Sequence, residues 1–281
     1  MKPAVAQVCS LESAFERDIE DYAAGACSAI ELWLGKLEGF LEQHTAAEVR
    51  ELLASHGLVA PVASFQGGLL TSQGERRREH WDHFARRLDL LREIGVETLV
   101  VAADIGGPLT QEDIDRVTAS LAEAAAVALA QPAARAASSG VRLAVEFQAR
   151  ASFMNNLQTA AAVIADLGSP HVGLCLDAFH YYVGPSKPED LAYLSAANVF
   201  HVQVCDLPGV AREFASDSDR VLPGDGDIPL EPLVAALKAI RYDGYVSVEL
   251  MNPQIWRVPA RQFGEIAMTA VRKLLGLARM E

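Results

Sequence analysis

Short apolar runs alternate along the whole chain with longer segments that carry apolar residues at helical spacing. Runs of aliphatic and β-branched residues bounded by polar or glycine-containing turns predict buried strands, and the 3.6-residue periodicity between them predicts helices. The predicted strands cover residues 3–9, 29–34, 58–64, 98–103, 141–147, 172–177, 199–205 and 245–250. The predicted helices cover residues 11–24, 46–56, 75–94, 111–138 (with Pro132 as a kink), 157–167, 190–197, 230–240 and 259 to the C-terminus.

Eight strand–helix units of similar length in one chain predict an α/β protein with a parallel sheet closed into a (β/α)8 TIM barrel. No linker rich in glycine, serine or proline divides the chain, so we expect residues 1–281 to form a single barrel domain. A doubly wound open sheet is the alternative. It is disfavoured because no glycine-rich phosphate-binding motif follows the first strand.

The charge balance narrows the classes of partner. The chain has 24 basic and 37 acidic residues and a formal charge of −13. This charge argues against nucleic acid or an anionic membrane surface as a binding partner. No secretory leader or membrane-length apolar run is recognisable, so we expect a cytoplasmic protein. Assembly into a homo-oligomer stays open.

The cysteines lack metal-site spacing and are predicted to be buried free thiols: Cys9, Cys27, Cys175 and Cys205.

Polar residues with metal or proton-transfer chemistry stand at the ends of the last four predicted strands. Glu146, Asp177, Gln203 and Glu249 occupy corresponding positions on neighbouring strands, whose carboxyl ends meet at one side of the barrel mouth. Three carboxylates brought together repel one another unless a cation compensates them. An all-oxygen donor set suits Mg²⁺ or Mn²⁺ better than Zn²⁺. Taken singly, each residue has a structural explanation, such as Asp177 capping the turn that follows it.

The same segments resemble the xylose-isomerase-like TIM-barrel superfamily of sugar isomerases and epimerases. The segments are Ala144-Val-Glu-Phe147, Gly173-Leu-Cys-Leu-Asp-Ala-Phe-His180, Phe200-His-Val-Gln203, Asp219-Arg-Val-Leu-Pro-Gly-Asp-Gly-Asp-Ile228 and Val246-Ser-Val-Glu-Leu-Met-Asn-Pro253 with Trp256. Within the superfamily the chain is most similar to inosose (2-keto-myo-inositol) isomerases. Many members carry histidine where this chain has Gln203, whereas hydroxypyruvate isomerases resemble it in using glutamine.

The resemblance implies a metal-dependent isomerase or epimerase of a keto sugar or cyclitol. The implied ligands are Glu146, Asp177, Gln203 and Glu249, with Mn²⁺ or Mg²⁺ favoured and Co²⁺ or Zn²⁺ as alternatives. Glu146 and Glu249 would exchange protons with the substrate through a metal-stabilised cis-enediolate. His180 and Arg220 would contact substrate oxygens.

Several further residues are weaker candidates. Arg212 is a rival for the role of Arg220, and Glu31 is a possible acid on the second strand. Three aromatic residues could wall the substrate or simply pack in the core: Trp33, Phe65 and Trp256.

Two other functions are alternatives. If a hydroxyl lies β to the carbonyl, the same intermediate can expel it, making the protein a dehydratase acting on inosose or 3-dehydroshikimate. A non-catalytic sugar-binding or accessory subunit would need no paired carboxylates. An apurinic endonuclease of the same superfamily would need more histidine ligands and a basic surface, so we set it aside.

Overall fold

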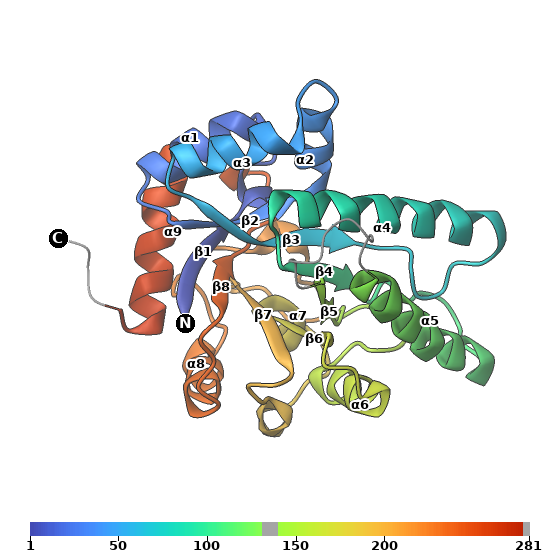
Figure 1. Cartoon of the computed structure of the whole chain (residues 1–281). Helices are drawn as coiled ribbons and strands as arrows, with labels where there is room; N and C mark the ends of the chain where they lie inside the picture. Colours follow the sequence, from blue (N-terminus) through green and yellow to red (C-terminus); the bar gives the residue numbers. More distant parts are fainter. Residues whose placement is uncertain (131–139, 278–281) are drawn as a thin grey trace.

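The strands form one closed parallel barrel in which every strand pairs with its neighbours in sequence and β1 pairs with β8 (Figure 1). The computed structural model describes residues 1–130 and 140–277. The strands are β1 (Lys2–Ala6), β2 (Ala29–Trp33), β3 (Val59–Gln66), β4 (Thr98–Ala102), β5 (Arg142–Glu146), β6 (Val172–Asp177), β7 (Val199–Val204) and β8 (Tyr245–Val248).

The longer helices surround this barrel (Figure 1). The α-helices are α1 (Phe15–Ala24), α2 (Leu34–Leu41), α3 (Ala46–Ser55), α4 (Gly74–Ile94), α5 (Gln111–Leu129), α6 (Leu157–Leu167), α7 (Ala178–Val183), α8 (Leu230–Ala239) and α9 (Ala260–Leu275). Short 3-10 turns are η1 (Gln7–Ser10), η2 (Pro188–Tyr193), η3 (Asp217–Asp219) and η4 (Ile255–Arg257). In the described ranges, no helix is both long enough and apolar enough to cross a membrane.

The predicted barrel is confirmed, with local corrections. The helices α2 and α7 were not expected, and the helix expected at 190–197 is instead the 3-10 turn η2. The first strand ends at Ala6, because the segment expected to complete it forms the 3-10 turn η1 instead. The predicted helix 111–138 is observed as α5, while its remainder from 131 onward, with Pro132, lies outside the described residues.

The side chains on the two faces of a strand pack into different clusters. In β5, Leu143 and Val145 join the large core between strands and helices, whereas Ala144 joins a small cluster inside the barrel. That inner cluster consists of Val62, Val100, Ala144, Cys175 and Phe200. Glu146 follows Ala144 on the same strand face, because side chains two residues apart point the same way. The polar site therefore lies next to the apolar inner cluster, at the carboxyl ends of the strands.

Gly173 of β6 provides the space for one member of this cluster. A Cβ at this position would lie 2.6 Å from ring atoms of Phe200 and 2.7 Å from the carbonyl oxygen of Asn198. We expect Gly173→Ala to destabilise the protein by about 1–3 kcal/mol through overpacking. Gly39→Ala in α2, where a Cβ meets nothing within 4 Å, is the matched control and should be neutral or stabilising. Urea unfolding of both variants measures the difference, and equal stabilities would contradict this account.

Candidate active site

The four predicted residues are brought together at the carboxyl ends of β5 to β8. Glu146 and Asp177 are the last residues of β5 and β6, Gln203 lies one residue before the end of β7, and Glu249 directly follows β8. Asp177 is in register with Gln203, which in turn pairs with Ser247 on β8. All four predicted side chains are buried.

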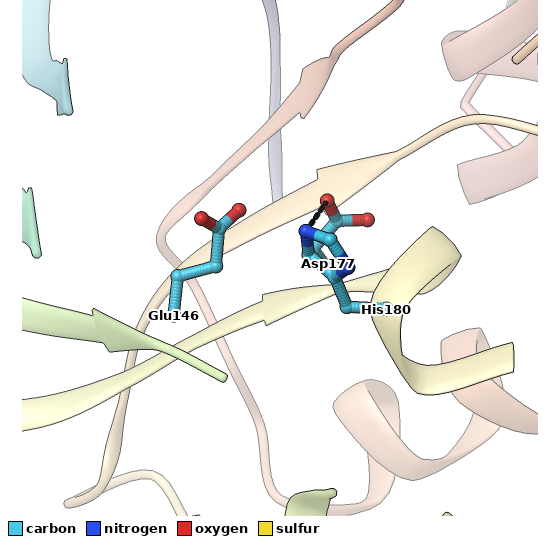
Figure 2. A group of neighbouring side chains, drawn as sticks. All are labelled: Glu146, Asp177 and His180. Atoms are coloured by element: carbon cyan, nitrogen blue, oxygen red, sulfur yellow. Dashed lines mark ion pairs between the residues drawn. The ribbon is translucent and has the colours of Figure 1, made fainter. Parts of the chain in front are cut away.

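Glu146, Asp177 and His180 form a compact group of potential ligands. One ligand atom from each lies within 4.8 Å of the others, and Figure 2 shows the side chains converging from β5, β6 and the start of α7. The Nε2 atom of His180 is 3.9 Å from Oδ2 of Asp177. The Nδ1 atom of His180 accepts a hydrogen bond from the amide of Ala149 at 3.3 Å, which leaves Nε2 facing the carboxylate.

Asp177 has both a structural and a chemical role. Its Oδ1 accepts a hydrogen bond from the amide of Phe179 at 2.7 Å and thereby caps α7. The other oxygen, Oδ2, is buried and accepts no hydrogen bond from any residue in 1–130 or 140–277. Its near partners there are the guanidinium of Arg220, at a distance that satisfies an ion pair without hydrogen-bond alignment, and Nε2 of His180. The capping explanation is therefore correct but accounts for only one of the two oxygens.

Arg220 lies among the carboxylates and is 1 % exposed. Its Nη1 is 2.9 Å from Oδ2 of Asp177 and 2.9 Å from Oε2 of Glu249. Its Nε and Nη2 donate to Oδ1 of Asp217 at 3.0 and 2.7 Å, and its guanidinium lies 4.4 Å from the ring centroid of Phe179. Most of its donors are thus used by the protein, so its principal visible role is to neutralise the acidic cluster.

Arg212, the predicted rival, is held elsewhere. Its Nη2 donates to the carbonyl oxygen of Gly184 at 2.7 Å, and its guanidinium lies over the ring of Tyr182. It is exposed on the loop that follows β7. The structure therefore associates Arg220, and not Arg212, with the carboxylates.

Gln203 presents its nitrogen to the carboxylates. Its Nε2 donates to Oε1 of Glu31 and to Oε1 of Glu249, each at 2.8 Å. Its Oε1 accepts a hydrogen bond from the thiol of Cys175 at 3.0 Å. That Gln203 offers this oxygen to a cation stays a prediction.

Glu31 and His201 form a buried pair beneath the site, which sequence reasoning did not anticipate. The Nε2 atom of His201 is 2.8 Å from Oε2 of Glu31, and the hydroxyl of Ser247 is 3.3 Å from the same nitrogen. Glu31 was expected only as a possible acid, and His201 had no assigned role. The two-residue spacing of His201 and Gln203 was the available signal, since it places both on one face of β7.

The electrostatics of the site favour occupation by a cation. Burial raises the pKa of Glu146 well above its usual value, and the charge of Asp177 raises it further. Burial likewise raises the pKa of Glu249; Arg220 opposes this, while Asp177 and Glu146 add to it. Burial would also raise the pKa of Glu31, but the charge and hydrogen bond of His201 outweigh it and the pKa is lowered. Arg220 alone therefore does not offset the cost of ionising all of these carboxyls, and Oδ2 of Asp177, which accepts no hydrogen bond in the described residues, is a donor of the type that hard divalent ions bind.

Of the three predicted aromatic residues, two have rings close together in the part of the chain that the structure describes. The rings of Trp33 and Phe65 lie 5.3 Å apart at the ends of β2 and β3, and Phe65 is 40 % exposed. Trp256 lies in η4 after β8, which contacts η1. A ligand at the mouth would therefore find an aromatic pair on the β2–β3 side.

Cation binding should strengthen as the pH rises. A carboxyl whose pKa is raised in the folded state contributes stability that is present below its unfolded-state pKa and is lost as the pH rises through the folded value. Glu146 and Glu249 both have raised pKa values in the metal-free protein. A cation binds the deprotonated forms and so competes with protons. We expect the increase in Tm on adding Mn²⁺ to grow from acidic to neutral pH; an increase that is the same at every pH would contradict this.

Comparison with known proteins agrees with this architecture. A family model described as "Xylose isomerase-like TIM barrel" matches residues 21–270. The chain is 27% identical over 232 residues to the inosose isomerase of Bacillus velezensis, a match that covers 82% of this chain and 80% of that protein. It is also 27% identical to the 3-dehydroshikimate dehydratase of Pseudomonas aeruginosa, over 99% of this chain but only 42% of that longer protein.

A solved structure shares the whole fold. The crystal structure of the IOLI protein with a binding zinc atom superposes with a TM-score of 0.90 and covers 100% of both chains, at 24% sequence identity. At this identity the superposition supports the fold alone, while the family model covers most of the sequence as well. The chain belongs to the xylose isomerase-like TIM barrel family.

Proposed function

We propose that this protein is a divalent-metal-dependent isomerase or epimerase of a keto sugar or inosose, for which Mn²⁺ or Mg²⁺ is our preferred ion. The observation that carries the proposal is the pair of buried glutamates with raised pKa values, Glu146 on β5 and Glu249 after β8, on either side of Asp177. Isomerisation and epimerisation both need a base that removes a proton and an acid that returns one.

The carboxylates of Glu146, Asp177 and Glu249 would hold the cation. When bound, a divalent ion supplies positive charge beside the substrate's carbonyl and adjacent hydroxyl oxygens, which makes the neighbouring C–H bond more acidic. Arg220 would not contact the substrate directly, since its donors already serve Asp177, Glu249 and Asp217.

The protein side chains would carry the proton transfers. One of Glu146 and Glu249 removes the proton next to the carbonyl, and the other returns a proton to the adjacent carbon or to the opposite face. A raised pKa suits this work because it makes each carboxyl a weaker acid, which takes up and holds a proton more readily. The Nε2 atom of His180 faces the same group of carboxylates and can orient a substrate oxygen. Burial of these side chains keeps bulk water away from the carbanion.

The substrate class is supported by similarity to inosose isomerases, so a cyclic keto polyol is our first choice. A small molecule is the only partner that the proposal requires, in a single barrel domain acting in the cytoplasm. A dehydratase is the second candidate. It is favoured by the 3-dehydroshikimate dehydratase whose matched part covers 99% of this chain.

Incubation with inososes, ketoses and 3-dehydroshikimate in deuterated water tests both candidates. For an isomerase or epimerase, proton NMR should show a new isomer in which the carbon next to the carbonyl carries deuterium. A dehydratase should instead yield an ultraviolet-absorbing product that has lost one water. If neither exchange nor product forms with any divalent ion, the proposed function is wrong.

A further inference from the structure

Asp206 is a buried carboxylate, two residues after the end of β7, that takes no part in the proposed proton transfers. The residue is 1 % exposed, and both of its carboxylate oxygens accept hydrogen bonds from backbone amides. Oδ1 accepts from Leu207 at 2.9 Å and from Ile228 at 2.8 Å, and Oδ2 accepts from Gly224 at 2.9 Å. Hydrogen bonds from N–H groups to an ionised acceptor are among the stronger ones in proteins. The carboxylate therefore joins the two ends of the long loop between β7 and α8.

The backbone of Asp206 is paired with the part of the loop that returns to the barrel, residues 220–228, which we call the returning segment. Asp206 and Val221 form an antiparallel bridge, in which each amide donates to the carbonyl oxygen of the other residue, at 2.8 and 2.9 Å. Gly226 packs closely here: a Cβ would lie 2.6 Å from Oδ1 of Asp206 and 2.6 Å from the amide nitrogen of Leu207. Both the backbone and the side chain of Asp206 thus hold the returning segment against the end of β7.

Arg220 lies at the point where the returning segment meets the barrel mouth. Fixing Val221 opposite Asp206 also fixes where the side chain of the preceding residue, Arg220, begins. From there its Nη1 is 2.9 Å from Oδ2 of Asp177 and 2.9 Å from Oε2 of Glu249. In the described residues, the hydrogen bonds of the Asp206 carboxylate all go to backbone amides, so its direct contacts are with the loop and not with the carboxylates of the site.

We propose that Asp206 is a positioning residue: it holds the returning segment so that Arg220 places its positive charge between Asp177 and Glu249. The inference rests on the proposed cation site, because it concerns the charge that such an ion would meet there. A divalent cation and the guanidinium both bring positive charge to the same carboxylates, and like charges repel. Releasing Arg220 from this position should therefore strengthen binding of the cation, whereas a general loosening of the mouth would weaken it.

Mn²⁺ binding to the EDTA-stripped protein, followed by the electron paramagnetic resonance signal of the free ion, measures this effect without turnover. Asp206→Asn keeps the size of the side chain, but one acceptor atom becomes an NH₂ group that faces backbone N–H groups. We expect the dissociation constant for Mn²⁺ to fall by about two- to fivefold, the effect of moving one unit charge away from about 4 Å in a water-like medium. Gly226→Ala disturbs the same carboxylate without changing any charge and should act in the same direction.

A double-mutant cycle with Arg220→Met tests whether Asp206 acts through Arg220. Substitutions at independent sites change an equilibrium additively, and substitutions along one chain of contacts do not. Once the guanidinium is absent, Asp206→Asn should leave the Mn²⁺ dissociation constant within about twofold of that of Arg220→Met alone. The urea midpoints of the four proteins in EDTA form a second cycle. There the loss in the double variant should be smaller than the sum of the two single losses.

Asp190→Asn is the matched control, because Asp190 is also buried and accepts from a backbone amide, that of Lys187 at 2.8 Å, but lies in η2. It should leave Mn²⁺ binding unchanged. Weaker Mn²⁺ binding in Asp206→Asn and Gly226→Ala, or additive effects in either cycle, would overturn the proposal. If the wild type binds no Mn²⁺, the proposed function fails, and the cycle of urea midpoints alone then decides the role of Asp206.

Discussion

Glu146→Gln and Glu249→Gln are each expected to lower kcat by a factor of about 10²–10⁴, because each removes a group that exchanges a proton with the substrate. Glutamine keeps the size and hydrogen-bonding capacity of the side chain but cannot act as the acid or base. Each variant also replaces one of the carboxylates proposed to hold the cation. We therefore expect both to lose most of the thermal stabilisation by Mn²⁺ or Mg²⁺.

The stability of the metal-free variants separates a chemical effect from a folding defect. Removing a buried carboxyl whose pKa is raised by burial and neighbouring charge relieves an unfavourable interaction. The Tm in EDTA should therefore be unchanged or higher than in the wild type. Glu123→Gln, an exposed position on α5 that pairs with Arg77, is the control and should keep both activity and metal response. Full activity in either site variant would contradict the proton-transfer mechanism.

Arg220→Met is expected to have the largest effect on stability. The substitution leaves Asp177 and Glu249 buried without their counter-charge, although methionine still fills much of the volume. Removing one partner of a buried ion pair typically costs about 3–5 kcal/mol. Denaturant unfolding of the metal-free protein measures this loss.

The cation should partly replace the missing guanidinium. We expect Mn²⁺ to raise the Tm of Arg220→Met more than that of the wild type, because the variant has more negative charge to neutralise. Arg212→Met, on the exposed loop after β7, is the control and should change stability by no more than about 0.5 kcal/mol. A loss of similar size in both arginine variants would show that Arg220 has no special electrostatic role.

The order of the elements could be predicted from the sequence because each buried strand reads as a short apolar run with a boundary. The helix α2 was missed since Leu34–Leu41 contains Gly35 and Gly39, which weaken a helical prediction. The helix α7 was missed because it begins directly at Asp177, with no turn between strand and helix. Tertiary contacts, and not local propensity, decide both cases.

The site was predictable in position but not in detail. Strand ends in a barrel converge by geometry, so Glu146, Asp177 and Glu249 could be placed together from their sequence positions alone. The orientation of the Gln203 amide depends on Glu31, 172 residues away, and the burial of Arg220 depends on how the loop after β7 folds back. Sequence spacing contains no information on either contact.

The pairing of β1 with β8, from Lys2 opposite Tyr245 to Val5 opposite Val248, makes the barrel's closure depend on the two ends of the described chain. During synthesis, the first strand emerges long before its final neighbour, and until then both ends of a growing sheet present unpaired backbone groups. Such exposed edges promote association between incomplete chains. A ribosome-bound chain that stops before Tyr245 should therefore depend on chaperones and aggregate when released, whereas a chain that has completed β8 no longer presents an open edge.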